Sequence, residues 1–283
     1  MKKVKFIYNP NSGERRIGNE IDKIIETYQK YNYSVSPFRL SKDRPISDAF
    51  FDIDCDYDHV LISGGDGTVD LIVNAMKELN VNMSIGILPS GTANDFAKAV
   101  NLPFNPVECI ERIVKSKPKK VDIGKINHKY FINVASAGMF TDVSQKINPE
   151  FKNSMGKVSY YLKGIEEALY MRKFSIEVNS SEINYNGDMY LMLIFNGKTA
   201  GNINLAYKAE IDDGLLDVII VKKILLPNML PLLINILKGE HLEGYNKDEI
   251  LYFKTNKLKI DCKDNLNTDI DVEKGPDIPL EIE

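Results

Sequence analysis

The stretch that decides the fold reads Val60-Leu61-Ile62-Ser63-Gly64-Gly65-Asp66-Gly67-Thr68, an apolar run followed by a glycine-rich loop. Beyond the loop, apolar residues recur at helical spacing and predict a helix that begins there: Val69, Ile72, Val73, Met76 and Leu79. The free N–H groups and the positive dipole end of such a helix form an anion site. Asp66 would repel a bare phosphate, so its place among the glycines makes sense if a divalent cation, or a water on one, separates the acid from a nucleotide. The loop therefore predicts metal-nucleotide chemistry.

Two more loops of this kind follow predicted strands in the first hundred residues. One strand is expected over residues 4–8, before Asn9-Pro10-Asn11-Ser12-Gly13, and another over residues 85–88, before Pro89-Ser90-Gly91-Thr92. Ligands of open α/β sheets bind at the carboxyl ends of the strands, so we expect the three loops to share one edge. Taken singly, each loop is equally well explained as a tight connection, with Asp66 or Asn94 as a helix cap. Three together favour a binding site, and without the lysine of a P-loop its phosphates would be held mainly by backbone N–H groups and metal.

The sequence pattern changes near the middle of the chain, from alternating strands and helices to mainly strands. Alternating strands and helices over the first hundred residues predict a mostly parallel sheet covered by helices. From about Val121 onward, short β-rich runs separated by Asn-Gly and Asp-Gly pairs predict a second, mainly antiparallel β-domain, with the boundary between Lys117 and Val121. The expected strands cover residues 121–126, 130–135, 174–178, 190–195, 216–221 and 250–253. Two helices are expected among them, over residues 158–169 and 230–237.

Composition limits the class of protein. With 283 residues, 43% of them hydrophobic, the chain can bury a sizeable core and is long enough for two domains. A net charge of -4 gives no broad basic field for nucleic acid. Three dispersed cysteines fit a reducing cytosol, and the N-terminus leads into a strand-like run rather than a signal peptide. The most apolar stretch, residues 224–237, is too short and too interrupted to span a bilayer, so we expect a cytoplasmic protein without a transmembrane segment.

Three motifs, taken in order, resemble those of the soluble lipid kinases of the diacylglycerol kinase catalytic-domain family, especially the bacterial members: Asn9-Pro10-x-Ser12-Gly13, Gly64-Gly65-Asp66-Gly67-Thr68, and residues 89–97. The resemblance continues at Val121-Asp122-Ile123-Gly124 and at residues 156–164 and 211–217, and so covers nearly the whole chain. It implies an ATP-binding catalytic domain over residues 1–120 and a β-sandwich lipid-kinase C-terminal domain over residues 121–283. The Gly-Gly-Asp-Gly-Thr motif alone is shared with NAD kinases, so the lipid-kinase assignment depends on residues 90–97 and 212–217.

The resemblance also implies roles for individual residues. Asp66 would reach the active-site magnesium through water, with Asp95 in the same network. The nucleotide contacts of the family fall on Asn9, Pro10, Asn11, Ser12, Gly13, Ser41, Gly64, Gly65, Asp66, Gly67, Thr68, Val69, Asp70, Gly91 and Thr92. A structural magnesium would be held by the carboxylate of Asp213 and the backbone carbonyls of Glu210 and Leu215. Read from the residues alone, Asp212-Asp213-Gly214 is equally a simple hairpin turn.

The general base of the family, the glutamate of an Asp-Gly-Glu motif, corresponds to Glu273 in Asp271-Val272-Glu273. Valine replaces the glycine here. The alternative for Glu273 is a solvated acid in an acidic tail. Two other departures from the family pattern are Glu14, where a basic residue is common, and Asp70 in place of an asparagine.

The leading hypothesis is an ATP- and Mg²⁺-dependent kinase that phosphorylates the hydroxyl of a membrane lipid at the bilayer surface, with diacylglycerol as the first candidate and phosphatidate as its product. Peripheral association with the membrane during turnover and no nucleic-acid partner are expected, and the oligomeric state is open, a homodimer included. One alternative is a kinase of a soluble acceptor such as NAD. The other is a catalytically silent nucleotide-binding protein, which Val272, Glu14 and the short tail after Glu273 would favour.

Overall fold

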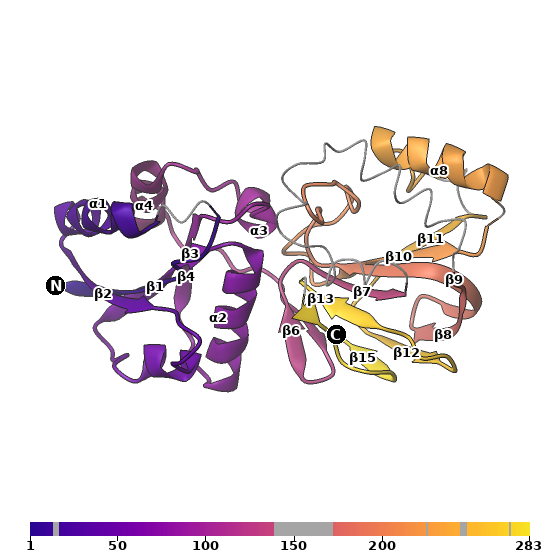
Figure 1. The fold of residues 1–283 in the computed structure, drawn as a ribbon, viewed down its shortest axis with the longest axis horizontal. Helices are drawn as coiled ribbons and strands as arrows, with labels where there is room; N and C mark the ends of the chain where they lie inside the picture. The colour runs from indigo at the N-terminus through magenta and orange to yellow at the C-terminus, as the bar shows by residue number, and fades with distance from the viewer. Residues whose placement is uncertain (14–16, 139–171, 225, 244–247, 272) are drawn as a thin grey trace. The chain divides into compact units, whose positions relative to one another are not determined.

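A computed structural model describes the chain except for residues 14–16, 139–171, 225, 244–247 and 272. The helix expected over residues 158–169 lies outside the described residues. The chain divides into two compact units, Met1–Val121 and Asp122–Glu283 (Figure 1). Each unit has its own hydrophobic core.

The first unit is a four-stranded parallel sheet in the order β2-β1-β3-β4, which confirms the predicted architecture. Its strands are β1 (Lys2–Tyr8), β2 (Tyr33–Arg39), β3 (Tyr57–Gly64) and β4 (Ser84–Pro89). Its helices are α1 (Ile17–Lys30), α2 (Asp66–Glu78), α3 (Asp95–Ala99) and α4 (Pro106–Lys115), with a short 3-10 helix over Ile46–Phe50. Helices α1 and α4 lie on one face of the sheet and α2 lies on the other (Figure 1).

The sheet is covered on both faces because its central strands are apolar on both sides. In β3, every residue from His59 to Gly64 is buried, as expected for a parallel strand between two layers of helices. Ile24 and Tyr28 of α1 and Ile110 of α4 are fully buried in one cluster with residues of β1 and β3. This packing fixes the strand ends, and with them the loops that follow.

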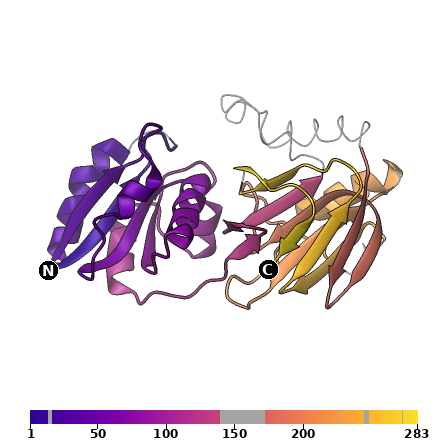
Figure 2. The same cartoon turned by 90° about the horizontal axis from the view of Figure 1, so that it is seen from below.

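The second unit is an antiparallel sheet of eleven strands that curls on itself (Figure 2), which confirms the predicted second β-domain. Its strands are β5 (Gly124–Ile126), β6 (Lys129–Phe131), β7 (Val134–Gly138), β8 (Phe174–Ser180), β9 (Asn184–Phe195), β10 (Leu216–Lys222), β11 (Ile250–Thr255), β12 (Leu258–Cys262), β13 (Thr268–Ile270), β14 (Glu273–Lys274) and β15 (Leu280–Ile282). One face of the sheet encloses a core that includes Ile176, Ile194 and Ile260. Helix α8 (Leu226–Lys238) packs through Leu232 on a separate cluster. None of the described helices, α8 included, combines the length and the apolar character that crossing a bilayer requires.

Two predicted strands are wrong in detail, and the reason lies in the hydrogen bonds. The strand expected over 121–126 begins only at Gly124, because the backbone of Asp122 bonds to the carbonyl of Ile211 and to the side chain of Asn196. The strand expected over 130–135 is two strands, β6 and β7, because the N–H groups between them donate to the side chain of Asp271. The side chains of Asn196 and Asp271, whose contacts the sequence pattern does not reveal, therefore shorten or divide these strands.

Candidate functional site

The three glycine-containing loops lie together at the carboxyl ends of β1, β3 and β4. The Asn9 N–H donates to the carbonyl of Ser63 over 2.9 Å, and the Ser90 N–H donates to the carbonyl of Gly64 over 3.1 Å. Side chains add to this connection, since Asn9 Nδ2 donates to Thr68 Oγ1 over 3.1 Å. The structure thus brings the predicted loops into one place, with the N-terminus of α2 among them.

Glycines are required where these loops touch. A Cβ atom on Gly91 would overlap the Cα of Gly65, and one on Gly13, whose φ is +51°, would overlap the carbonyl oxygen of Ser90. Backbone therefore meets backbone across the three loops, and no side chain separates them at these contacts. Gly13 is exposed and Gly65 and Gly91 are half-buried, so the joined loops leave room for an anion to approach the main chain closely.

We expect Gly91→Ala to lower the free energy of unfolding of the first unit by about 1–3 kcal/mol, because the added methyl group has no room and the loops must shift. The matched control is Gly67→Ala, since nothing lies within 4 Å of a Cβ on Gly67. Denaturant unfolding of both variants measures the effect. Equal stability of the two would contradict the close contact of Gly65 and Gly91.

Asp66 joins two of the loops rather than capping its own helix. It is the first residue of α2, yet its Oδ1 accepts the N–H of Phe96 in α3 over 3.1 Å. The residue before α3, Asn94, has left-handed backbone dihedrals and no capping bond; its side chain exchanges two bonds with Gly91 instead, at 2.8 and 2.7 Å. Asn94 therefore stabilises its own loop, and the half-buried Asp66 carboxylate caps the N-terminus of α3.

The other predicted residues of this unit are placed as follows. Asp95 is 4% exposed in α3, and Asp70 is 6% exposed in α2, where its carboxylate accepts Asn74 Nδ2 over 3.1 Å. Ser41 follows β2 and pairs with Arg44 in an isolated bridge, and the Leu40 N–H beside it donates to the carbonyl of Tyr8 at the end of β1. The remaining residues lie in the three loops or at the start of α2: Asn9, Pro10, Asn11, Ser12, Gly13, Gly64, Gly65, Gly67, Thr68, Val69, Gly91 and Thr92.

In the second unit, Asp213 lies in a turn where a lysine already neutralises its negative charge. Its Oδ1 accepts the N–H of Leu215 over 3.0 Å, and its Oδ2 lies 2.8 Å from Lys254 Nζ. The Gly214 N–H next to it donates to Asp122 Oδ2 over 2.7 Å. Partial burial opposes the charge of Lys254, but the hydrogen bond to Asp213 and the negative charges of Asp217, Asp213 and Glu210 together outweigh it and raise the pKa of the ammonium. A cation at this turn must therefore share the carboxylate with Lys254 or displace it.

A second acid, Asp217, lies beside this turn. It is fully buried, its Oδ1 accepts the Tyr252 hydroxyl over 2.5 Å, and its Oδ2 lies 3.6 Å from Lys254 Nζ. Burial raises the pKa of Asp217 above the ordinary range of a carboxyl group. No group of three acids, histidines or cysteines suited to a metal occurs among the described residues. One carboxylate with the carbonyls of Glu210 and Leu215 remains compatible with Mg²⁺, which keeps several waters when it binds to proteins.

Glu273 is the first residue of β14, and its side chain is exposed. It pairs with Ile270 in an antiparallel hairpin, with Asp271 in the turn that precedes it. Within the part of the chain that the structure describes, the Glu273 carboxylate has no hydrogen bond or ion pair. Asp271, two residues earlier, is 2% exposed and faces the segment between β6 and β7. The two acids of this motif therefore have different surroundings.

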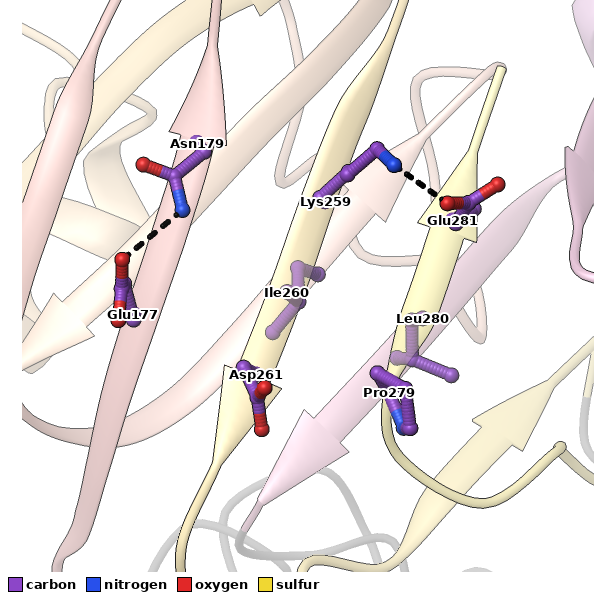
Figure 3. A pocket seen from close by; sticks show the side chains of 8 residues that line it. All are labelled: Glu177, Asn179, Lys259, Ile260, Asp261, Pro279, Leu280 and Glu281. Carbon is purple, nitrogen blue, oxygen red and sulfur yellow. Dashed lines mark hydrogen bonds and ion pairs between the residues drawn. The ribbon is translucent and has the colours of Figure 1, made fainter.

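A shallow depression elsewhere on the second unit is not part of this site. It has a volume of about 290 Å³ and lies on the polar face of β8, β12 and β15 (Figure 3). Two contacts join side chains within it: Lys259 Nζ lies 2.5 Å from Glu281, and Asn179 donates to Glu177. None of the predicted site residues lines it.

Comparisons with known proteins cover both units. Residues 3–126 match the family described as the diacylglycerol kinase catalytic domain, and residues 133–283 match the YegS C-terminal NAD kinase beta sandwich-like domain. A diacylglycerol kinase of Staphylococcus aureus (strain bovine RF122 / ET3-1) is 31% identical over 288 residues, covering 98% of this chain and 88% of the relative. One from Bacillus subtilis (strain 168) is 28% identical over 284 residues, covering 99% and 93%. A solved structure from Bacillus anthracis str. Sterne has a TM-score of 0.83 at 25% identity and covers 100% of this chain and 93% of that one.

Proposed function

The chain belongs to the diacylglycerol kinase catalytic domain family, and from this premise we propose that it is a lipid kinase that transfers the γ-phosphoryl group of ATP to diacylglycerol and gives phosphatidate. The observation that carries the proposal is the similarity over nearly the full chain to bacterial proteins named diacylglycerol kinases. Catalysis would take place at the bilayer surface. The protein would be cytoplasmic and would associate with the membrane peripherally during turnover.

The proposed ATP-binding domain comprises residues 1–120, which lie in the first unit. Support comes from the backbone surface that Gly13, Gly65 and Gly91 keep open and from the N-terminus of α2, which favours negative charge. The carboxylate of Asp66 lies at the start of α2 and is oriented by the Phe96 N–H of α3. Asp66 would hold Mg²⁺ through water. Asp95, which precedes the hydrogen-bond partner of Asp66, Phe96, would belong to the same network. The ion, when bound, neutralises phosphate charge.

The second unit supplies the proposed base. Phosphoryl transfer needs little covalent help from protein, so positioning, charge neutralisation and one proton transfer make up most of the catalytic task. As the acceptor oxygen bonds to the γ-phosphorus and the bond to ADP breaks, the hydroxyl proton passes to Glu273. The exposed Glu273 carboxylate is suited to accept it, because it is hydrogen-bonded or ion-paired to none of the residues that the structure describes.

A direct comparison of acceptors tests the proposal. Transfer of labelled phosphate from ATP to diacylglycerol in mixed micelles is expected, and transfer to NAD is not. Label on NAD alone would favour a kinase of a soluble acceptor, and ATP binding without turnover on any lipid alcohol would favour a silent relative. Mass spectrometry of the phosphorylated products from a total membrane lipid extract would then identify the acceptor.

We also propose that Asp213, with the carbonyls of Glu210 and Leu215, binds a structural Mg²⁺. The melting temperature should then rise in Mg²⁺ and fall after chelation, because an ion that binds only the folded state stabilises it by mass action. Asp213→Asn should abolish this response, whereas the exposed neighbour Asp212→Asn should keep most of it.

Lys254 makes that test sharper. Because its ammonium lies 2.8 Å from the Asp213 carboxylate, it competes with any cation there, and Lys254→Met should increase the response to Mg²⁺. A melting temperature that responds to neither Mg²⁺ nor EDTA, in the unmodified protein and in Lys254→Met, would leave the turn as a hairpin closed by an ion pair.

A further inference from the structure

The carboxylate of Asp271 is bound by three consecutive backbone N–H groups. Its Oδ2 accepts the N–H of Ile132 over 2.7 Å, and its Oδ1 accepts those of Asn133 and Val134 over 3.1 and 2.9 Å. The side chain is 2% exposed. Consecutive peptide N–H groups that converge on one anion form a strong and direction-specific contact, and charge-assisted bonds of this kind are about twice as strong as neutral ones.

Asp271 is also held through its main chain. Its N–H donates to the carbonyl of Val134 over 3.0 Å, and its φ of +47° places it in the left-handed region, which aspartate tolerates better than most residues. It directly follows Ile270, which pairs with Glu273 across the hairpin. Asp271 is therefore fixed both by its backbone and by its side chain.

The segment that receives Asp271 is itself fixed. The buried side chain of Asn196 donates through Nδ2 to the carbonyls of Asp122 and Ile132, over 2.8 and 2.9 Å. The Asn196 N–H donates to the carbonyl of Asn133 over 2.8 Å. Residues 132–134 are thus held from β9 on one side and present their N–H groups to Asp271 on the other.

Glu273, by contrast, has few restraints of its own. Strand β14 is two residues long, lies at the end of the sheet and, among the described strands, pairs with β13. Two residue pairs, Asp269 with Lys274 and Ile270 with Glu273, make up that pairing. The position of the Glu273 carboxylate therefore depends on the backbone on both sides of it. Asp271 anchors the chain before it, and after it the Gly275 N–H donates to the carbonyl of Thr268 over 3.0 Å and Lys129 Nζ donates to the carbonyl of Lys274 over 3.1 Å.

We propose that Asp271 is a positioning residue, whose carboxylate fixes the hairpin loop against residues 132–134 and so sets the place of Glu273, without taking up the substrate proton itself. This inference rests on the proposed function, in which Glu273 is the base. It gives the first acid of the motif a role that differs from that of the second, because the first is buried against N–H donors and the second is exposed.

A double-mutant cycle tests the inference. Asp271→Asn keeps the volume of the side chain but replaces one acceptor oxygen with a donor that faces the N–H groups. We expect it to lower kcat about 10- to 100-fold and to leave the KM for ATP unchanged. In the Glu273→Gln background the same substitution should have almost no further effect, because a residue that acts through another is not additive with it.

Other outcomes overturn the proposal. Equal fold-losses for Asp271→Asn in both backgrounds would mean that Asp271 acts independently of Glu273. Asp271→Ser, which keeps one acceptor oxygen, repeats the cycle if Asp271→Asn does not fold. If neither variant folds, Asp271 serves the fold as a whole and the positioning role is rejected.

A second measurement does not depend on turnover and separates this inference from the proposed function. Hydrogen exchange of the unmodified protein and of Asp271→Asn should differ at Glu273 and Lys274 and agree over β9 and β10. Unchanged exchange in the hairpin would contradict the inference even in an active enzyme. An unmodified protein that phosphorylates no acceptor, with the expected change in exchange, would reject the proposed function and keep the anchoring role of Asp271.

Discussion

Asp66→Asn should fold as the unmodified protein does and lose about 100-fold or more in turnover. The expected loss follows from the removal of the negative charge that would locate the metal-phosphate complex, since a positioning group of this kind is typically worth at least this factor. The expected retention of the fold follows from the structure, because the asparagine oxygen can still accept the N–H of Phe96, as Asp66 Oδ1 does at 3.1 Å. The measurement is steady-state kinetics with a melting curve for each variant.

The comparison with Asp66→Ala separates the two roles of this side chain. Alanine removes the charge and also leaves the Phe96 N–H at the start of α3 without its cap, which costs about 1 kcal/mol of stability for a typical cap. We expect both variants to lose turnover and only Asp66→Ala to lose stability. Near-normal turnover in a folded Asp66→Asn protein would reduce Asp66 to a cap that ties two loops together.

The sequence was sufficient for the parts of the fold that repeat a pattern. Strand β3 was predicted because its central residues are buried on both faces and form the apolar run Val60-Leu61-Ile62. Strand β2 was missed, since it lies at the edge of the sheet, where Pro37 is tolerated and only Tyr33 and Phe38 are buried. Helix α4 was missed although Asn105 and Pro106 are a recognisable start signal for a helix.

The candidate site divides in the same way. The meeting of the three loops was predictable, because the carboxyl ends of neighbouring parallel strands lie at one edge. The contact of Asp66 with Phe96, 30 residues away, and that of Asp271 with Ile132, 139 residues away, have no local signal in the chain. Lys254 on Asp213 was missed for the same reason. Only the folded sheet brings these partners together.

Glu273→Gln should lower turnover about 100- to 10,000-fold, or about 3 to 5 kcal/mol of barrier, with ATP affinity nearly unchanged. A primary hydroxyl has a very high pKa, so a carboxylate must accept its proton as the bond to phosphorus forms. Glutamine keeps the shape of the side chain and removes the base. Because Glu273 is exposed and contacts no partner among the described residues, the substitution should leave the melting temperature unchanged. The loss should therefore appear in kcat and not in stability.

The choice of control for this prediction depends on the burial of the neighbouring acid, Asp271. Asp271→Asn alone is ambiguous, since a loss there follows both from a misplaced Glu273 and from a base at Asp271. Glu281→Gln is a cleaner control, because Glu281 is an exposed acid of the same tail whose partner, Lys259, lies on the polar face of the sheet. We expect full activity in Glu281→Gln. Full activity in Glu273→Gln as well would make Glu273 one more solvated acid of that tail, whereas full activity in Glu273→Gln together with collapse in Asp271→Asn would move the base to the buried carboxylate.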